Sequence, residues 1–286
     1  MSEPRVEDVA IAAKDGYPLA ATSFLPDPPP ATWVIVNSAT AVRRTYYARF
    51  ARFLAEQGLA VVTYDYRGIG GSRPKRLRGF AARMRDWAQQ DAAGVIDWVA
   101  ARHPGRVLAV GHSFGGQALG LLPRAERLSG ALIVGAQSGY WGHWPGWRAP
   151  VIGALWYTLM PALSALCGFY PASLFRMGED MPAGVAQEWA RWGRRRGYVT
   201  EADGGALRPG YARVAFPIRS YSFSDDSFAP PRAVEALLGF YSGAPIERRA
   251  LTPRDLGVRA IGHWGFFRER FRDPLWLEAA AWLRHV

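Results

Sequence analysis

Residues 106–116 read Arg-Val-Leu-Ala-Val-Gly-His-Ser-Phe-Gly-Gly, an apolar run that turns abruptly into a helix-forming segment. The short, partly β-branched stretch 107–110 is typical of a fully buried parallel strand. The Gly-x-Ser-x-Gly turn after it is typical of a nucleophile elbow. We expect Ser113 to have strained backbone and a free hydroxyl. Gly111 and Gly115 should be required because a Cβ at either position would collide with the neighbouring strand and helix.

A serine hydroxyl needs a general base to become a nucleophile, and the chain contains five histidines. His263 is the best candidate, because the glycines at 262 and 265 allow a loop to bring its imidazole over the elbow. His112 precedes Ser113 on a sharp turn, so its side chain should point away from the hydroxyl. If no base reaches the elbow, the stretch is a glycine-rich connector with an idle serine. The remaining histidines are expected at the surface or in a cap: His103, His143 and His285.

The orienting acid should lie between the serine and the histidine in chain order. Residues 217–223 are predicted to form a strand that ends at Asp225 and Asp226. A carboxylate at that strand end can accept the second imidazole N–H, fix the tautomer and stabilise the imidazolium. We choose Asp226, which lies four residues before Pro230, the start of the next helix. Asp225 fits better as a turn or capping residue, although the choice between the two stays open.

Acyl transfer also needs backbone N–H groups that point at the developing oxyanion. One is expected from Phe114, which follows the nucleophile at a helix N-terminus whose dipole adds to the effect. The second should come from the loop after the predicted strand 32–36, where Ala39 is the first choice and Ser38 the second. Loss of one such donor typically costs about 10² to 10³ in rate, so this loop should be rigid.

These pieces, in this order, resemble the α/β-hydrolase superfamily over nearly the whole chain. More narrowly, the chain resembles a bacterial branch of predicted serine hydrolases of the serine aminopeptidase and monoglyceride lipase type. That branch carries Asn in place of the commoner His-Gly after the third strand, a Trp-rich cap and a Gly-His-x-Gly-Phe-Phe loop. The resemblance rests on Asn37-Ser38-Ala39, the stretch Tyr64-Asp65-Tyr66-Arg67-Gly68-Ile69-Gly70-Gly71-Ser72, the elbow, Asp226 and the loop at Gly262-His263.

A chain of 286 residues can bury a large core, and strand-like segments alternate with helical ones. We predict an α/β-hydrolase fold with a mostly parallel eight-stranded sheet and helices on both faces. Residues 1–137 and 211–286 should form the core domain, and residues 138–210 a helical, Trp-rich cap after strand six. The expected strands are 7–13, 18–24, 32–36, 59–64, 106–110, 130–135, 217–223 and 246–252, and the expected helices are 44–57, 84–102, 114–125, 230–241 and 273–285.

In the predicted cap, the charge-free run 149–175 is long enough to suggest a membrane span. Pro161 and Pro171 should interrupt it, however, and both flanks are basic, which gives no orientation. An apolar cap explains the same composition, since it expels water from a mostly apolar pocket. We therefore expect no transmembrane segment and leave peripheral membrane contact through the cap open.

The net charge of +11 comes almost entirely from scattered arginines, which favours a solvated surface over a nucleic-acid site. An exception is the cluster of Arg191 and Arg194–Arg196, which could steer anionic substrates or phospholipid head groups. No metal or cofactor is expected, because the histidines are far apart and the glycines of 68–71 fit no phosphate-binding motif. The polar N-terminus predicts no signal peptide and a cytoplasmic location.

The predicted activity is that of a serine hydrolase that cleaves carboxylic esters of apolar small molecules through Ser113, His263 and Asp226, with an acyl-enzyme intermediate. Amide or peptide hydrolysis and acyl transfer use the same groups and stay open as alternatives. A non-catalytic ligand-binding protein on the same fold is a third alternative. A serine at the elbow argues against haloalkane dehalogenase and epoxide hydrolase chemistry. The sequence indicates no oligomeric state.

Overall fold

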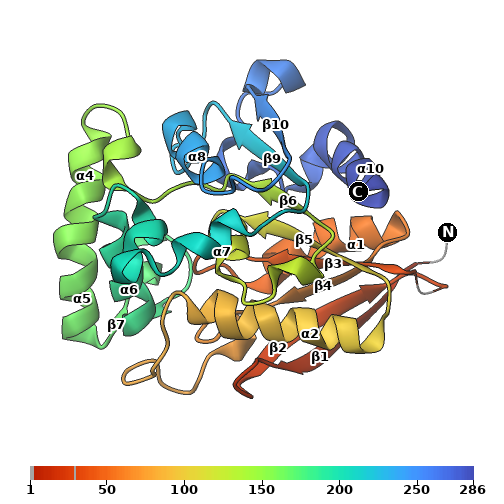
Figure 1. Cartoon of the computed structure of the whole chain (residues 1–286), viewed down its shortest axis with the longest axis horizontal. Coiled ribbons are helices and arrows are strands. Elements are labelled where there is room, and N and C mark those ends of the chain that lie inside the picture. The colour runs from red at the N-terminus through yellow and green to blue at the C-terminus, as the bar shows by residue number, and fades with distance from the viewer. Residues whose placement is uncertain (1–2, 29) are drawn as a thin grey trace.

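A central eight-stranded sheet organises the computed structural model, with the strand order β1-β2-β4-β3-β5-β6-β9-β10 (Figure 1). The structure describes residues 3–28 and 30–286; Met1, Ser2 and Pro29, which fall in the predicted core domain, lie outside the described residues. Strand β2 is antiparallel to β1 and β4, and the pairs from β4 to β10 are all parallel. The predicted mostly parallel, eight-stranded sheet is therefore confirmed.

All eight predicted strands are present, with ends that differ from the prediction by two residues or fewer. The buried middle strands carry apolar side chains on both faces, as expected for parallel strands covered on both sides. The strands are β1 (Arg5–Ala12), β2 (Pro18–Leu25), β3 (Thr32–Asn37), β4 (Ala60–Tyr64), β5 (Arg106–His112), β6 (Gly130–Val134), β9 (Ile218–Phe223) and β10 (Ile246–Leu251).

Helices cover both faces of the sheet and enclose two apolar cores. Val34 of β3 packs in the core with α1 (Ala48–Glu56) and α10 (Leu277–His285). The next residue, Ile35, packs in the opposite core with α2 (Ala93–Arg102) and α8 (Pro231–Leu238). Side chains alternate across a strand, so neighbouring residues serve opposite cores. The short helix α3 (Phe114–Gln117) follows β5 at the centre of the sheet.

Shorter helical pieces extend or join these helices. The π-turns η3 (Trp87–Ala92) and η12 (Arg272–Trp276) lead into α2 and α10, and α9 (Gly262–Gly265) lies between β10 and η12. The 3₁₀ turns of the core are η1 (Arg44–Tyr47), η2 (Gly70–Ser72), η4 (Ala118–Leu121), η5 (Ala125–Arg127), η10 (Pro253–Leu256) and η11 (Glu269–Phe271).

Between β6 and β9 the chain leaves the sheet, and we call residues 135–217 the insertion. It lies beside the sheet in Figure 1. That it forms a separate domain with boundaries at 138 and 210 stays a prediction. Its elements are η6 (Trp141–His143), α4 (Arg148–Ala154), η7 (Leu155–Leu159), α5 (Met160–Cys167), β7 (Phe169–Tyr170), η8 (Ala172–Phe175), β8 (Met181–Pro182), α6 (Ala183–Gly193), η9 (Tyr198–Gly205) and α7 (Arg208–Ala212).

The prediction that Pro161 interrupts the apolar run is wrong, because α4, η7 and α5 form one continuous helix from Arg148 to Cys167. The π-turn η7 ends immediately before α5, and Pro161 occupies the first turn of α5, where its missing N–H is tolerated. The helix ends at Gly168, whose left-handed backbone (φ +75°) is typical of a helix C-cap.

Candidate active site

The elbow at Ser113 has the strained geometry that its sequence predicts. Ser113 lies between β5 and α3 with φ 51° and ψ −112°, a backbone conformation that non-glycine residues rarely adopt. A Cβ on Gly115 would lie 2.1 Å from the Asn37 carbonyl oxygen, and one on Gly111 would lie 2.5 Å from the Gly115 backbone. The predicted requirement for both glycines is confirmed, since strand β3 and helix α3 leave no space for a side chain.

His263 and Asp226 form a buried pair beside the elbow. The Nδ1 atom of His263, on the short helix α9, lies 2.7 Å from Oδ2 of Asp226. The other carboxylate oxygen, Oδ1, accepts the backbone N–H groups of Phe228 and Ala229 at 2.8 and 3.0 Å. A Cβ on Gly135 would lie 3.1 Å from both Oδ2 and Nδ1, so only a glycine fits comfortably behind the pair. Two backbone donors thus fix the carboxylate that orients the imidazole.

Asp225, the neighbouring carboxylate, holds the histidine segment instead of the imidazole. It accepts the backbone N–H groups of Ile261 at 2.8 Å and of Gly262 at 3.1 Å. These are the two residues that precede His263. The structure therefore brings Asp226 to the imidazole. Asp225, which the sequence suggested as a turn or capping residue, positions the backbone before His263.

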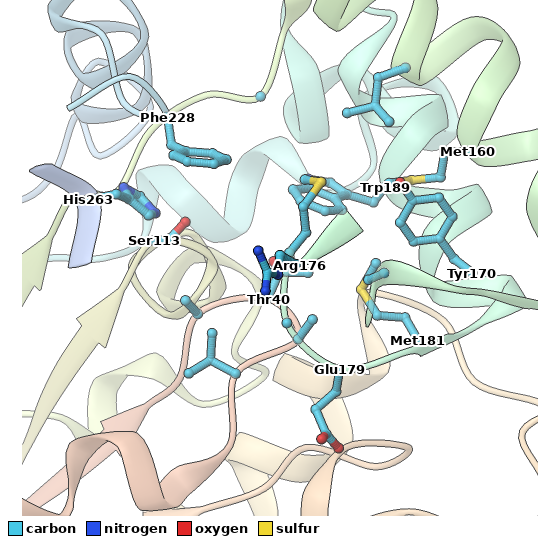
Figure 2. Close-up of a pocket in the computed structure, with 18 of the residues that line it drawn as sticks. Thr40, Ser113, Met160, Tyr170, Arg176, Glu179, Met181, Trp189, Phe228 and His263 are labelled. Atoms are coloured by element: carbon cyan, nitrogen blue, oxygen red, sulfur yellow. The ribbon is translucent and has the colours of Figure 1, made fainter. Parts of the chain in front are cut away.

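Ser113 and His263 line the same cavity. Figure 2 shows the Ser113 hydroxyl turned toward the imidazole. Within the described residues the two side chains make no hydrogen bond with each other. Catalytic hydrogen bonds are often long without substrate and tighten when it binds, so this arrangement is compatible with proton transfer between them.

A hydrogen-bonded chain behind the site joins three segments that lie far apart in sequence. The N–H of Ala39 donates to the Tyr47 hydroxyl at 2.8 Å, and that hydroxyl lies 2.9 Å from Nδ1 of His112. Because the Tyr47 oxygen accepts from Ala39, its own proton is free to donate to Nδ1. The opposite ring atom of His112, Nε2, then donates to the His263 carbonyl oxygen at 3.0 Å. This pattern assigns the Nε2–H tautomer to a neutral His112.

Burial holds the pKa of His112 well below its usual value of 6.5, and the nearby His263 lowers it further. The imidazole therefore stays neutral, as the hydrogen-bond pattern requires. The prediction that His112 points away from the Ser113 hydroxyl is confirmed. Sequence reasoning missed Tyr47, because nothing local connects it with a histidine 65 positions away.

The same contacts bear on the predicted oxyanion donors. The Ala39 N–H, the first choice for the second donor, is held by Tyr47 and points at that hydroxyl. The second choice, Ser38, is fully buried and does not line the cavity. Thr40 does line it, and in the described part of the chain its N–H has no acceptor. The Phe114 N–H also lacks an acceptor there, at the first residue of α3. The contacts thus favour Phe114 and Thr40 over Ala39 and Ser38.

The cavity has a volume of about 440 Å³ and lies between the core and the insertion. Its only carboxylate among the described residues, Glu179, forms an ion pair with Arg43 and accepts the Gly70 N–H at 3.0 Å. Most of the other lining groups are apolar. Aromatic and methionine side chains from the insertion include Trp144, Trp156, Met160, Tyr170, Met181 and Trp189, several of which Figure 2 labels. An apolar ligand fits this composition.

Within residues 3–28 and 30–286, no group of three His, Cys, Asp or Glu side chains that could hold a metal ion is present. Ser113 follows β5, Asp226 follows β9 and His263 lies on α9 after β10, so all three lie at the carboxyl edge of the sheet (Figure 1). Ligands bind at this edge in open α/β sheets.

The family model of serine aminopeptidases, S33, matches residues 28–185, which is more than half of the chain. The chain belongs to this hydrolase family. The match begins before β3, includes the elbow and ends in α6, so it covers part of the insertion. The family resemblance predicted from the motifs is therefore confirmed. A comparison with curated proteins finds no match.

Solved structures with the same fold cover almost the entire chain. An esterase from Pyrococcus furiosus superposes with a TM-score of 0.63 at 15% identity, over 98% of this chain and 90% of that chain. An esterase from Exiguobacterium antarcticum gives 0.64 at 16% identity, over 97% and 100%. A hypothetical protein from Pseudomonas aeruginosa gives 0.65 at 15%, over 100% and 95%. At these identities the likeness establishes the α/β-hydrolase fold of this family member.

Proposed function

We propose that this hydrolase is a serine esterase that acts on carboxylic esters of apolar small molecules. The observation that carries the proposal is the buried contact of 2.7 Å between His263 Nδ1 and Asp226 Oδ2, beside a strained Ser113 in the same apolar cavity. A histidine oriented by a carboxylate, next to a serine on a tight turn, is the arrangement that activates a hydroxyl nucleophile.

The reaction proceeds in two halves. In the first, Nε2 of His263 removes the Ser113 proton as Oγ attacks the ester carbonyl carbon, and Asp226 stabilises the imidazolium. The tetrahedral intermediate collapses when its bond to the alcohol oxygen breaks and Nε2 returns the proton to that oxygen, which leaves acyl-Ser113. In the second half, His263 removes a proton from water, and the water oxygen attacks the acyl carbon. Protonation of Ser113 Oγ then releases the carboxylic acid.

Two backbone N–H groups would stabilise the oxyanion in each half. Phe114 is one, at the start of α3, where the exposed N–H groups of the helix favour negative charge. Thr40 is the other, because its N–H has no partner among the described residues and it lines the cavity. Each such donor typically contributes about 10² to 10³ in rate. The Tyr47 contact holds the adjacent Ala39, which keeps this loop in place.

The composition of the cavity favours esters over peptides. An aminopeptidase must bind the cationic α-amino group of its substrate, for which an unpaired carboxylate is the natural partner. Among the described lining residues, Glu179 is the only carboxylate, and Arg43 already neutralises it. A neutral, apolar ester needs no such partner. Amide hydrolysis and acyl transfer are separated from ester hydrolysis by their products.

A fluorophosphonate probe tests the nucleophile. The wild-type protein should be labelled and Ser113→Ala should not. The control is Ser227→Ala, at an exposed serine next to Asp226, and it should be labelled like the wild type. Labelling that persists in Ser113→Ala would assign the nucleophile to another residue.

Turnover of p-nitrophenyl esters of increasing chain length, beside aminoacyl-anilides, tests the substrate class. Faster cleavage of the anilides would replace the esterase proposal by a peptidase.

A further inference from the structure

The helix Arg148–Cys167 carries a long apolar surface that the other described residues leave exposed. Among the described residues it is the one helix long and apolar enough to cross a membrane, and most of it is not buried. Trp147, just before the helix, is 73% exposed, and Leu166, near its end, is 77% exposed. Large apolar side chains exposed at both ends of one apolar helix indicate a binding surface.

The helix has two different faces. Trp156 and Met160, with the buried Gly153 and Ser164, form the inner face, and the first two line the cavity. The outer face repeats at intervals of three and four residues, as a helix surface does: Trp147, Val151, Ala154, Thr158, Ala162 and Ala165, all exposed. Because the inner face packs against the protein and lines the cavity, lipid cannot surround this helix. The helix lies along the outer edge of the molecule, with α6 between it and the sheet (Figure 1).

The surroundings of the outer face are basic. Residues 141–178 contain no Asp or Glu. The Arg194 guanidinium lies 5.1 Å from the centre of the Tyr157 ring and donates to the Trp156 carbonyl, which places Arg194 against the helix, and Arg195 and Arg196 follow it in the chain. Arg148, Arg195 and Arg196 are exposed. An apolar stripe with a cationic border matches a surface that offers acyl chains and negative charge together.

We propose that the helix Arg148–Cys167 docks in the plane of an anionic lipid bilayer, with its outer face among the acyl chains and the arginines at the head groups. Interfacial helices bind in this way through buried apolar area and attraction to anionic lipids, and each basic residue near such a surface adds to the binding. The inner face of the same helix lines the cavity, so docking places the cavity beside the source of apolar esters. The inference goes beyond the proposed esterase activity and does not depend on it.

Cosedimentation with vesicles tests the docking. The wild-type protein should bind mixed phosphatidylglycerol–phosphatidylcholine vesicles, bind pure phosphatidylcholine much more weakly, and dissociate as salt is added. Leu166→Ser should reduce the partition coefficient about tenfold, because a leucine side chain that docking buries among the acyl chains is replaced by a polar one. The matched control is Leu277→Ser on α10, which is 47% exposed and distant in the chain, and it should bind like the wild type.

Three results would overturn the proposal. One is wild-type protein that stays in the supernatant with anionic vesicles. Another is equal loss of binding in Leu166→Ser and Leu277→Ser. The third is a dimer in light scattering that Leu166→Ser converts to a monomer, since the helix would then cover a second copy of the chain. Ser113→Ala should bind vesicles normally, so failure of the docking and failure of the esterase proposal are separate results.

Discussion

Asp225 and Asp226 are neighbours in sequence but hold different atoms of the same segment. Asp226 accepts from the His263 imidazole, and Asp225 accepts from the backbone N–H groups of Ile261 and Gly262. We predict that Asp226→Asn lowers kcat about 10⁴-fold, because the amide no longer fixes the tautomer or stabilises the imidazolium. The measurement is p-nitrophenyl ester turnover by folded protein.

Asp225→Asn is the matched variant. Its amide oxygen can still accept one backbone N–H, so we expect a loss of stability of about 1 kcal/mol and a much smaller loss of kcat. A larger loss of kcat in Asp225→Asn than in Asp226→Asn would reverse the assignment. Thermal unfolding of both variants distinguishes the two causes of lost activity: a displaced histidine segment lowers stability, whereas the loss of a catalytic group lowers kcat in a protein that stays folded.

At the same scale, the sequence supports some residue choices and not others. Ser113, Asp226 and His263 could be selected because their order along the chain and the glycines around them are local signals. The contact between Tyr47 and Ala39 could not be anticipated, since it depends on how the turn η1 folds back onto the loop after β3. The Tyr47 hydroxyl, eight residues along the chain, accepts the Ala39 N–H, and for that reason the contacts favour Thr40 over Ala39 as the second oxyanion donor.

At the scale of elements, the elbow depends on the close approach of β3, β5 and α3. Gly115→Ala would place a Cβ 2.1 Å from the Asn37 carbonyl oxygen, a backbone atom that cannot move without shifting β3. We predict that this variant is destabilised by several kcal/mol or fails to fold, and that residual folded protein is not labelled by the fluorophosphonate. Loss of soluble protein and a lowered midpoint of urea unfolding are the measurements.

Gly257→Ala is the control for backbone strain alone. Gly257 has φ +64°, in the same left-handed region as other turn glycines, but no atom lies within 4 Å of its added Cβ. The substitution Gly257→Ala should lower the free energy of unfolding by about 1 to 2 kcal/mol and leave activity intact. If Gly115→Ala were no more destabilising than Gly257→Ala, the packing at the elbow would be looser than described.

The strands were easier to predict than the insertion. Buried parallel strands are short, apolar and β-branched, and β3 to β6 show this pattern without help from tertiary contacts. In the insertion, the apolar run gives no period that separates an inner from an outer face. Its helix continues through Pro161 because a π-turn precedes the proline, a local choice that no composition rule predicts.

At the scale of the whole molecule, the free energy of unfolding depends on pH through buried titratable groups that lie far apart in the fold. His112 is fully buried, and its pKa in the folded chain is well below 6.5. Burial raises the pKa of Asp91 to about 6, which acts in the opposite direction, because the folded chain then binds a proton more readily than the unfolded one. The difference in unfolding free energy between the wild type and a His112 variant at each pH is therefore more informative than the pH profile of either protein alone.

Above pH 6.5 His112 is neutral in both the folded and the unfolded chain, so its contribution to stability is fully present. Below about pH 6.5 the unfolded chain takes up a proton on His112 that the folded chain does not, and stability falls by up to about 1.4 kcal/mol per pH unit. We predict that His112→Gln has a shallower decline between pH 6.5 and the folded pKa. Glutamine has an acceptor for Tyr47 and a donor for the His263 carbonyl but does not titrate.

The measurement is the free energy of urea unfolding of both proteins at a series of pH values from 7.5 to about 5. The lowered pKa values of His103 and His143 affect both proteins equally, so they cancel in the difference. At pH 7.5 the variant should be as stable as the wild type or less stable. As the pH falls, the stability of the variant relative to the wild type should rise. Parallel profiles would mean that His112 takes up its proton at the same pH in the folded and the unfolded chain. The neutral Nε2–H tautomer that links Tyr47 to the His263 backbone would then be wrong.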